Sequence, residues 1–118
     1  MNYKLQSNGA SVLPDSDGRQ PFVEWLAGLA DRQARARIQA RLAVVAAGSL
    51  GDVEPAGEGV LELRINWGPG YRVYCARVGD VVILLDGGDK RTQHEDIKNA
   101  KTKFDDFKRR QCKAPQAR

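Results

Sequence analysis

Three short strand-like runs follow one another between residues 61 and 85, and only two glycine-containing turns separate them. In the first two runs, residues 61–67 and 71–76, apolar side chains alternate with polar ones, which predicts strands with one buried face. The third run, residues 81–85, is apolar throughout and predicts a central strand. Connections this short join antiparallel neighbours. We therefore expect the chain to fold around a small antiparallel sheet.

Two helices are predicted before this sheet and one after it. Pro21 suits the first turn of a helix, and Asp31 is the expected N-cap of a second helix that ends at Gly48. The last helix is expected to start near Thr92, because Thr92 and Glu95 have the spacing of a capping box. The second helix has an apolar stripe at helical spacing. This stripe consists of Ala34, Ile38, Leu42 and Val45.

The remaining segments are predicted as loops or ends. Residues 48–59 and the Gly-Gly segment at 86–89 are expected to be irregular. Residues 1–18 are poorly defined, with a short strand at either 3–6 or 11–13, and residues 108–118 form a basic, flexible tail. At 118 residues the chain is expected to be one domain, and the order of its elements indicates an α+β fold.

The charge of the chain is unevenly distributed. The net charge is +4, yet residues 1–89 hold nine basic against eleven acidic side chains, whereas residues 90–118 hold ten against four. A basic excess confined to one end suggests a nucleic acid or an acidic partner. The alternative is a solvated helix face followed by a frayed basic tail.

Several function classes find no support in the sequence. Cys75 and Cys112 form no metal or redox motif, no phosphate-binding loop is present, and His94 is the single histidine. We therefore expect neither a metal nor another cofactor. The longest apolar run is too short to cross a bilayer, and the N-terminus shows no secretory signal. These features predict a cytoplasmic protein without a membrane partner.

Four cationic side chains are the best candidates for chemistry. Arg64 and Arg72 have the same facing on neighbouring strands, and Lys90 and Arg91 follow the last strand. If the apolar sides of the strands meet the helices, both guanidinium groups lie on one surface of the sheet, where they suit a phosphate group. The alternative is that the cations form ordinary surface ion pairs with nearby acids. These acids are Glu62, Asp86 and Asp89.

Such a basic set can promote RNA cleavage without a metal. The 2′-hydroxyl attacks the adjacent phosphorus, and the protein stabilises the negative charge that develops in the transition state. Arg64, Arg72, Lys90 and Arg91 are the predicted catalytic set. A general base and a general acid are not evident, and His94 and Tyr74 are candidates by residue type alone.

Five motifs carry a resemblance to a known family. PFVEWLAGL, ARIQARL, GEGVLELRI, GPGYRVY and LLDGGDKRTQ resemble, in the same order over about residues 21–105, the RelE/ParE toxin superfamily. Within it, the match is to the HigB-like, phage-derived addiction module killer branch. The resemblance implies a RelE-like fold, with two N-terminal helices packed on a small antiparallel sheet and a C-terminal helix.

The resemblance also implies a function. The chain would be the toxin of a type II toxin–antitoxin module, held inactive by a cognate antitoxin of helix-turn-helix type. It would contact operator DNA only through that antitoxin. RelE and HigB members cleave mRNA on the ribosome without a metal and so inhibit translation. Arg72 matches the family's phosphate-stabilising arginine, Arg64 a basic position on the preceding strand, and Arg91 with Lys90 the basic position after the last strand.

The predicted RNA contacts come from the C-terminal half of the sheet and from the last helix. They are Lys98, Lys101, Tyr74 and His94. One departure concerns the tyrosine that some RelE members carry in this segment, because Ile97 stands there in this chain. Two alternative functions follow from it: a ParE-like inhibitor of DNA gyrase without nuclease activity, and a degenerate toxin that binds only its antitoxin or RNA.

Overall fold

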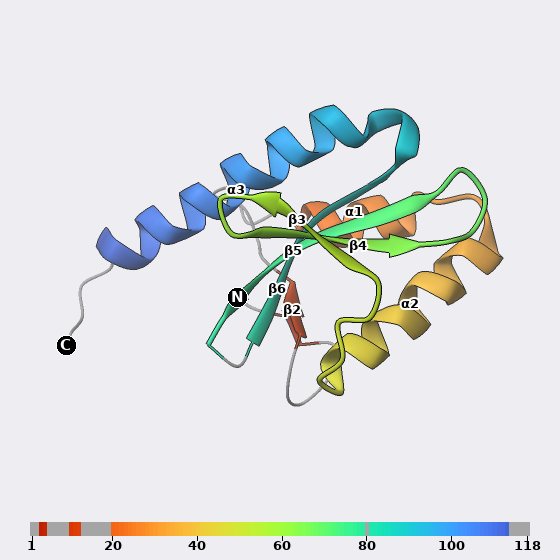
Figure 1. Ribbon diagram of the computed structural model, residues 1–118, viewed down its shortest axis with the longest axis horizontal. Coiled ribbons are helices and arrows are strands. Elements are labelled where there is room, and N and C mark those ends of the chain that lie inside the picture. The colour runs from red at the N-terminus through yellow and green to blue at the C-terminus, as the bar shows by residue number, and fades with distance from the viewer. Residues whose placement is uncertain (1–2, 5–9, 13–19, 80, 114–118) are drawn as a thin grey trace.

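A six-stranded sheet forms the centre of the structure, and helices pack on both of its faces (Figure 1). The computed structural model describes residues 3–4, 10–12, 20–79 and 81–113. The strands are β1 (Tyr3–Lys4), β2 (Ala10–Val12), β3 (Val53–Gly57), β4 (Val60–Ile65), β5 (Tyr71–Val78) and β6 (Val81–Asp89). The helices are α1 (Pro21–Ala27), α2 (Arg32–Ala46), the 3-10 helix η1 (Lys90–Thr92) and α3 (Gln93–Lys113).

The strand order is β1-β2-β6-β5-β4-β3. Strands β3 to β6 are antiparallel neighbours, β2 pairs with β6 in parallel, and β1 pairs with β2 in the antiparallel direction. Two N-terminal helices, an antiparallel sheet and a C-terminal helix on the sheet make this an α+β protein with a RelE-like layout, as predicted.

One predicted loop contains a strand. β3 lies within residues 48–59, and its composition, with Pro55 and two nearby glycines, gives no strand signal. Proline is tolerated here because β3 is an edge strand of the sheet, so a backbone N–H on its open side has no partner to lose. The register shift between Pro55 and Gly57 marks the same irregularity.

Helices α1 and α2 cover one face of the sheet, called here the α1/α2 face. Phe22 and the predicted stripe of α2 are buried there against Leu63, Val73 and Leu84. Asp31 caps α2 as predicted, because its carboxylate accepts hydrogen bonds from the backbone amides of Gln33 and Ala34 at 2.9 and 3.2 Å.

Helix α3 covers the opposite face, called here the α3 face. Ala100 and Phe104 of α3 are buried against a second apolar cluster on the strands. The expectation that β4 and β5 have only one buried face is therefore wrong. The second face is buried because the side chains that point away from α1 and α2 on three strands are themselves largely apolar and pack against α3. The residues concerned are Val60, Tyr74, Ala76, Ile83 and Leu85.

The Gly-Gly segment continues the last strand, where a break was expected. A Cβ atom at Gly87 would lie 2.2 Å from the ring of Trp25 on α1, and a Cβ atom at Gly88 would lie 1.8 Å from the carboxylate of Asp96 on α3. Neither glycine has a positive φ angle. The two glycines are needed because helices approach β6 closely from both faces at this point.

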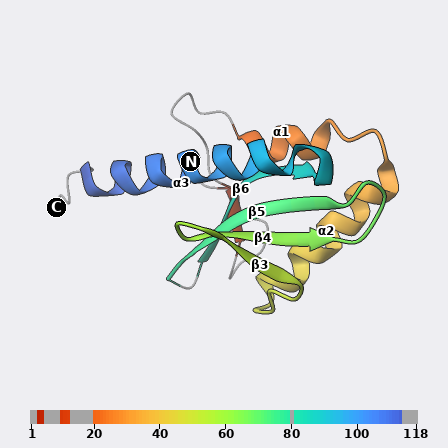
Figure 2. The same ribbon diagram turned by 45° about the horizontal axis from the view of Figure 1, so that its top comes forward.

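The last helix begins at Gln93, close to the predicted start near Thr92, but the capping residues differ from the prediction. Asp89 caps η1, because its carboxylate accepts a hydrogen bond from the amide of Arg91, and the hydroxyl of Thr92 accepts one in return from the amide of Asp89. The expected box of Thr92 and Glu95 is therefore wrong. The expected flexible tail from residue 108 is also wrong as far as Lys113, because α3 continues to that residue and extends past the sheet (Figure 2). Residues 114–118 lie outside the described part.

No helix within the described residues is long and apolar enough to cross a membrane.

Replacing Gly87 by alanine should destabilise the fold, because the rigid indole of Trp25 cannot yield as a flexible side chain can. We expect a loss of about 1–3 kcal/mol in the free energy of unfolding, the usual range for overpacking. Urea denaturation would measure it. Gly28→Ala is the matched control, since its Cβ would meet no atom closer than 3.3 Å. Equal effects of the two substitutions would contradict this account.

Candidate functional site

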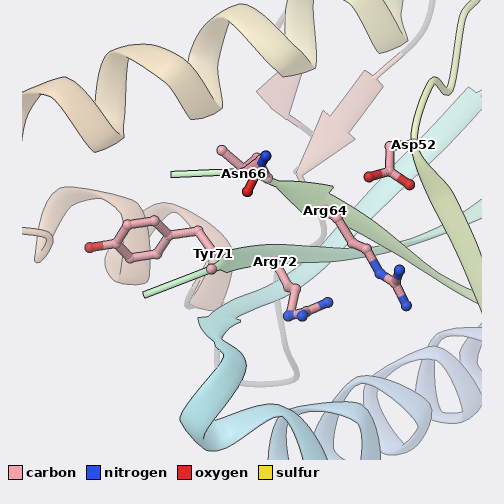
Figure 3. A pocket seen from close by; sticks show the side chains of 7 residues that line it. Asp52, Arg64, Asn66, Tyr71 and Arg72 are labelled. Carbon is pink, nitrogen blue, oxygen red and sulfur yellow. The ribbon is translucent and has the colours of Figure 1, made fainter. Parts of the chain in front are cut away.

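Arg64 and Arg72 lie directly opposite each other on adjacent strands. The register of β4 and β5 pairs Arg64 with Arg72, and pairs Glu62 with Tyr74 two residues further along. The side chains of Arg64 and Arg72 point to the same side of the sheet, toward α3 (Figure 3). The predicted common facing of the two arginines is thus present, and the register now gives their separation as a direct cross-strand pair.

A buried carboxylate joins the two arginines. Oε1 of Glu62 lies 3.4 Å from Nε of Arg64 and 3.4 Å from Nη1 of Arg72. Oε2 of Glu62 accepts hydrogen bonds from the Tyr74 hydroxyl at 3.2 Å and from the Gln93 amide at 2.7 Å. Glu62 is only 3% exposed. These five residues are called here the Glu62 cluster, and they connect β4, β5 and the start of α3.

The two guanidinium groups differ in their access to solvent. The Arg72 side chain is 12% exposed; its Nη1 meets Glu62 as an ion pair without hydrogen-bond geometry, and its Nε is buried without a hydrogen-bond partner. The Arg64 side chain is 40% exposed and also lies 3.9 Å from the carboxylate of Glu54. Arg72 is therefore a largely buried cation with an unused donor, whereas Arg64 is the more solvent-exposed member of the pair.

A cavity of about 150 Å³ lies beside this pair, where β4 ends and β5 begins (Figure 3). Both arginines take part in its lining. The lining residues are Asp52, Arg64, Ile65, Asn66, Gly70, Tyr71 and Arg72. At about 30 Å³ for each water molecule, the cavity has room for several waters or a small polar group.

The turn between β4 and β5 is held against the α1–α2 connection. The indole N–H of Trp67 donates a hydrogen bond to Asp31 at 3.2 Å, and the guanidinium of Arg37 lies 3.9 Å from the centre of the Trp67 ring. Hydrogen bonds from the Ala34 amide and the Trp67 indole lower the pKa of Asp31. These contacts fix the end of the hairpin that carries Arg64 and Arg72.

Lys90 and Arg91 do not join the Glu62 cluster. Arg91 forms an ion pair with Asp89 at 2.9 Å, its side chain is 79% exposed, and this pairing lowers the pKa of Asp89. Lys90 is exposed on η1 next to the β4–β5 turn, where a Cβ atom on Gly70 would lie 3.5 Å from its Cβ. The structure thus brings two of the four predicted cations into one cluster and places the other two on η1, which leads directly into Gln93.

The two candidates for proton transfer have very different environments. Tyr74 is fully buried, and burial together with the negative charge of Glu62 raises the pKa of its hydroxyl above the ordinary value. Tyr74 is therefore a hydrogen-bond donor at neutral pH, and it has no exposed ring on which a base could stack. His94 is exposed in the first turn of α3.

The predicted RNA-binding lysines lie further along α3. Lys98 is exposed, and Lys101 forms an ion pair with Glu58 at 3.7 Å. They line a surface hollow of about 410 Å³ between α3 and the β3–β4 turn. The other lining residues are Glu58, Thr102, Asp105 and Arg109. Cations and acids alternate in this hollow, so it is less basic than the sequence count suggests.

Two residues of the cluster were not singled out from the sequence. Glu62 was considered only as a surface partner of the arginines, and Gln93 was not considered at all. The ion pairs proposed as the alternative form in part: Arg64 and Arg72 contact Glu62, which is buried, and Arg91 contacts Asp89. Asp86 pairs instead with Lys103 at 3.0 Å. The burial of Glu62 has one sequence signal: on the same face it lies between Val60 on its own strand and Tyr74 on the next, although Arg64 follows it. Within the described residues, no group of three or more His, Cys, Asp or Glu side chains could hold a metal ion.

The described elements define an α+β protein with a RelE-like layout and an arginine pair on its α3 face. A protein of Haemophilus influenzae (strain ATCC 51907 / DSM 11121 / KW20 / Rd) is 48% identical to this chain over 81 residues, which are 68% of this chain and 82% of that protein. The chain belongs to the same family as that protein, whose name, "Uncharacterized protein", states no activity. No protein-family model and no solved structure matches the chain.

Replacing Tyr74 by phenylalanine should weaken the fold and change its response to alkali. At neutral pH we expect a loss of about 1–3 kcal/mol, because the buried Glu62 carboxylate loses a donor. The raised pKa means that the folded protein keeps the phenolic proton above about pH 10, where the unfolded chain releases it. Stability in the wild type therefore falls as the pH rises through this value, and the variant should fall less steeply.

Urea denaturation between about pH 9 and pH 11 would measure both effects. Burial also raises the pKa of Cys75 to about 12, so this thiol lowers the stability of wild type and variant equally as the pH rises. The difference in stability between the two proteins therefore reports Tyr74 alone. Tyr71→Phe is the control, since it leaves the bond between Tyr74 and Glu62 in place. An identical pH dependence in wild type and Tyr74→Phe would refute the assignment.

Proposed function

We propose that this protein is the toxin of a type II toxin–antitoxin module and acts in the cytoplasm as a ribosome-dependent mRNA endoribonuclease that inhibits translation. The observation that carries the proposal is the cross-strand pair of Arg64 and Arg72 on the α3 face, beside a cavity. The RelE-like layout and the resemblance of the motifs to RelE and HigB toxins support it.

The proposed chemistry requires charge stabilisation at one phosphate. The 2′-hydroxyl of a nucleotide attacks the adjacent phosphorus, the bond to the 5′-oxygen breaks, and the transition state carries extra negative charge on the phosphate oxygens. Arg72 supplies sheltered donors for these oxygens, and Arg64 supplies a second guanidinium from the open side. Glu62 contacts both arginines and Glu54 lies 3.9 Å from Arg64, so the pair offers an anion guanidinium donors in a fixed place and not a large net charge.

Four cations outside the Glu62 cluster are proposed to guide the RNA backbone; three are exposed, and Lys101 is partly buried and pairs with Glu58. Lys90 and Arg91 on η1 stand next to the β4–β5 turn, and Lys98 and Lys101 follow on α3. Contacts of this kind with phosphates carry no sequence information and weaken steeply with salt. His94 is the accessible candidate for proton transfer, because Tyr74 is enclosed. The proposed chemistry needs no metal and no organic cofactor.

The proposed partners follow from the same function. The ribosome supplies the mRNA in a fixed position, and a cognate antitoxin of helix-turn-helix type keeps the toxin inactive between inductions. Operator DNA would be contacted by that antitoxin, so the toxin needs no DNA-binding surface of its own.

Arg72→Gln should reduce cleavage of mRNA in the ribosomal A site by about 10²- to 10³-fold, the usual effect of removing one donor that stabilises a developing oxyanion. Purified protein, translating ribosomes and primer extension on the mRNA would measure the cleavage rate. Arg77→Gln is the matched control, because it removes the same charge from an exposed position on the same strand.

Arg72→Lys keeps the charge but lacks the planar fork, so it should recover only part of the rate. The substitutions must be made alongside a stability measurement, since removing one partner of a buried ion pair costs about 3–5 kcal/mol. Intact mRNA in the presence of folded wild-type protein would count against the nuclease.

A second candidate is a gyrase inhibitor of the ParE type. The enclosure of Tyr74 and the contacts of both arginines with Glu62 favour it, because they leave fewer free groups for nuclease chemistry than the sequence suggested. The fold serves both functions. Inhibition of gyrase in a supercoiling assay, together with intact mRNA on ribosomes, would support this candidate over the nuclease.

A further inference from the structure

The Glu62 carboxylate is the most enclosed charge among the described residues, and its contacts with Arg64, Arg72, Tyr74 and Gln93 all lie within the candidate site. We propose that Glu62 is a positioning residue, which holds Arg64 and Arg72 together so that both can bind one phosphate of the RNA. This role rests on the proposed ribonuclease function. It adds a residue to the site that is neither a phosphate ligand nor a proton donor.

The first argument concerns the repulsion between the arginines. Like charges directly opposite each other on antiparallel strands destabilise a sheet. Each arginine side chain also has many rotamers, so two guanidinium groups at this register without a shared partner would move apart. Oε1 of Glu62 lies at the same distance, 3.4 Å, from both. The strands already place both side chains on one face, and a single oxygen atom then holds the two guanidinium groups close to each other.

The second argument concerns the carboxylate itself. Oε1 faces the arginines, whereas Oε2 is fixed by the hydroxyl of Tyr74 on β5 and the amide of Gln93 on α3. The carboxylate cannot turn away without breaking these two bonds. Oε2 thus fixes the carboxylate to β5 and α3, and Oε1 orients the two guanidinium groups.

The third argument concerns the binding capacity that remains. Nη1 of Arg72 reaches Glu62 only as an ion pair at 3.4 Å, and Nε of Arg72 is buried without a hydrogen-bond partner. Arg64 remains 40% exposed. A carboxylate that only neutralised a buried arginine would leave no such surplus. The arrangement fits a site that is preorganised for an anion and not yet saturated by one.

The fourth argument links the cluster to the rest of the predicted site. Gln93 is the first residue of α3 and follows η1, which carries Lys90 and Arg91. Its 2.7 Å hydrogen bond to Glu62 holds the junction of η1 and α3 against the sheet. Glu62 therefore also sets where the exposed cations of η1 stand relative to the arginine pair.

Glu62→Gln tests the role, because the amide keeps the size of the side chain and removes its charge. The first readout uses the purified protein alone: the Nε–H signal of Arg64 and the Nη–H signals of Arg72 in 15N NMR spectra, with their rates of exchange with solvent. We expect slowed exchange at both sites in the wild type and faster exchange in the variant. Glu24→Gln, which removes an exposed charge on α1, should leave both signals unchanged.

The second readout is cleavage of mRNA on purified ribosomes. Loss of a group that orients a functional residue typically lowers activity about 10- to 100-fold, and we expect that loss in kcat with KM for the ribosome nearly unchanged. Glu62→Asp keeps the charge on a shorter stem and should restore part of kcat. If Glu62→Gln does not fold, Gln93→Ala serves instead, since it removes one anchor without changing any charge.

The outcomes separate the two proposals. Unchanged exchange at both arginines in a folded Glu62→Gln protein overturns the positioning role, whatever the ribosome assay shows. An equal fall in kcat and rise in KM, without rescue by aspartate, also overturns it and indicates a merely structural contact. Wild-type protein that leaves mRNA intact overturns the proposed function, and the NMR readout then decides whether Glu62 orders the arginines.

Discussion

The close approach of two helices to the same strand is the constraint on which this structure depends. Trp25 of α1 lies over Gly87 on one face of β6, and Asp96 of α3 lies over Gly88 on the other. Adjacent strand residues point to opposite faces, so two consecutive glycines let both helices dock at one level of the sheet. Larger residues there would push the helices outward and open the apolar clusters on both faces.

Docking of α3 at this level also decides the electrostatics of the site. Because the first turn of α3 covers the end of the α3 face, polar residues on β4 and β5 become enclosed, and Glu62 must find partners inside the protein. It finds four of them. The burial that stabilises the helix thus also concentrates two arginines and a carboxylate in a place with limited solvent access, where charge interactions are stronger than in water.

Much of the fold could be predicted from local patterns. The period of two in residues 61–67, the cap at Asp31 and the stripe of α2 are local signals, and the structure has all three elements, although β4 ends at Ile65. The failures concern tertiary context. β3 depends on pairing with β4, and the Gly-Gly segment continues a strand because of helices that are distant in the sequence.

The candidate site shows the same division. Alternation along the strands was enough to place Arg64 and Arg72 on one face, but neither their register nor the burial of Glu62 follows from it. Both depend on the turn at residues 66–70 and on the docking of α3. A closer look at the second face would have helped, since Val60, Tyr74 and Ala76 alternate with the first apolar set and signal a sheet covered on both sides.

The two possible meanings of an arginine beside a glutamate can be separated by geometry. A structural ion pair satisfies its donors, because unsatisfied buried groups cost stability. In this protein Glu62 instead makes its shortest bond to the neutral amide of Gln93 and longer contacts to both arginines, and Arg72 keeps a buried donor without a hydrogen-bond partner. Stability alone would favour a better satisfied arrangement. An unused guanidinium donor next to a cavity suits the proposed phosphate ligand, which has the charge and the geometry to supply the missing acceptor.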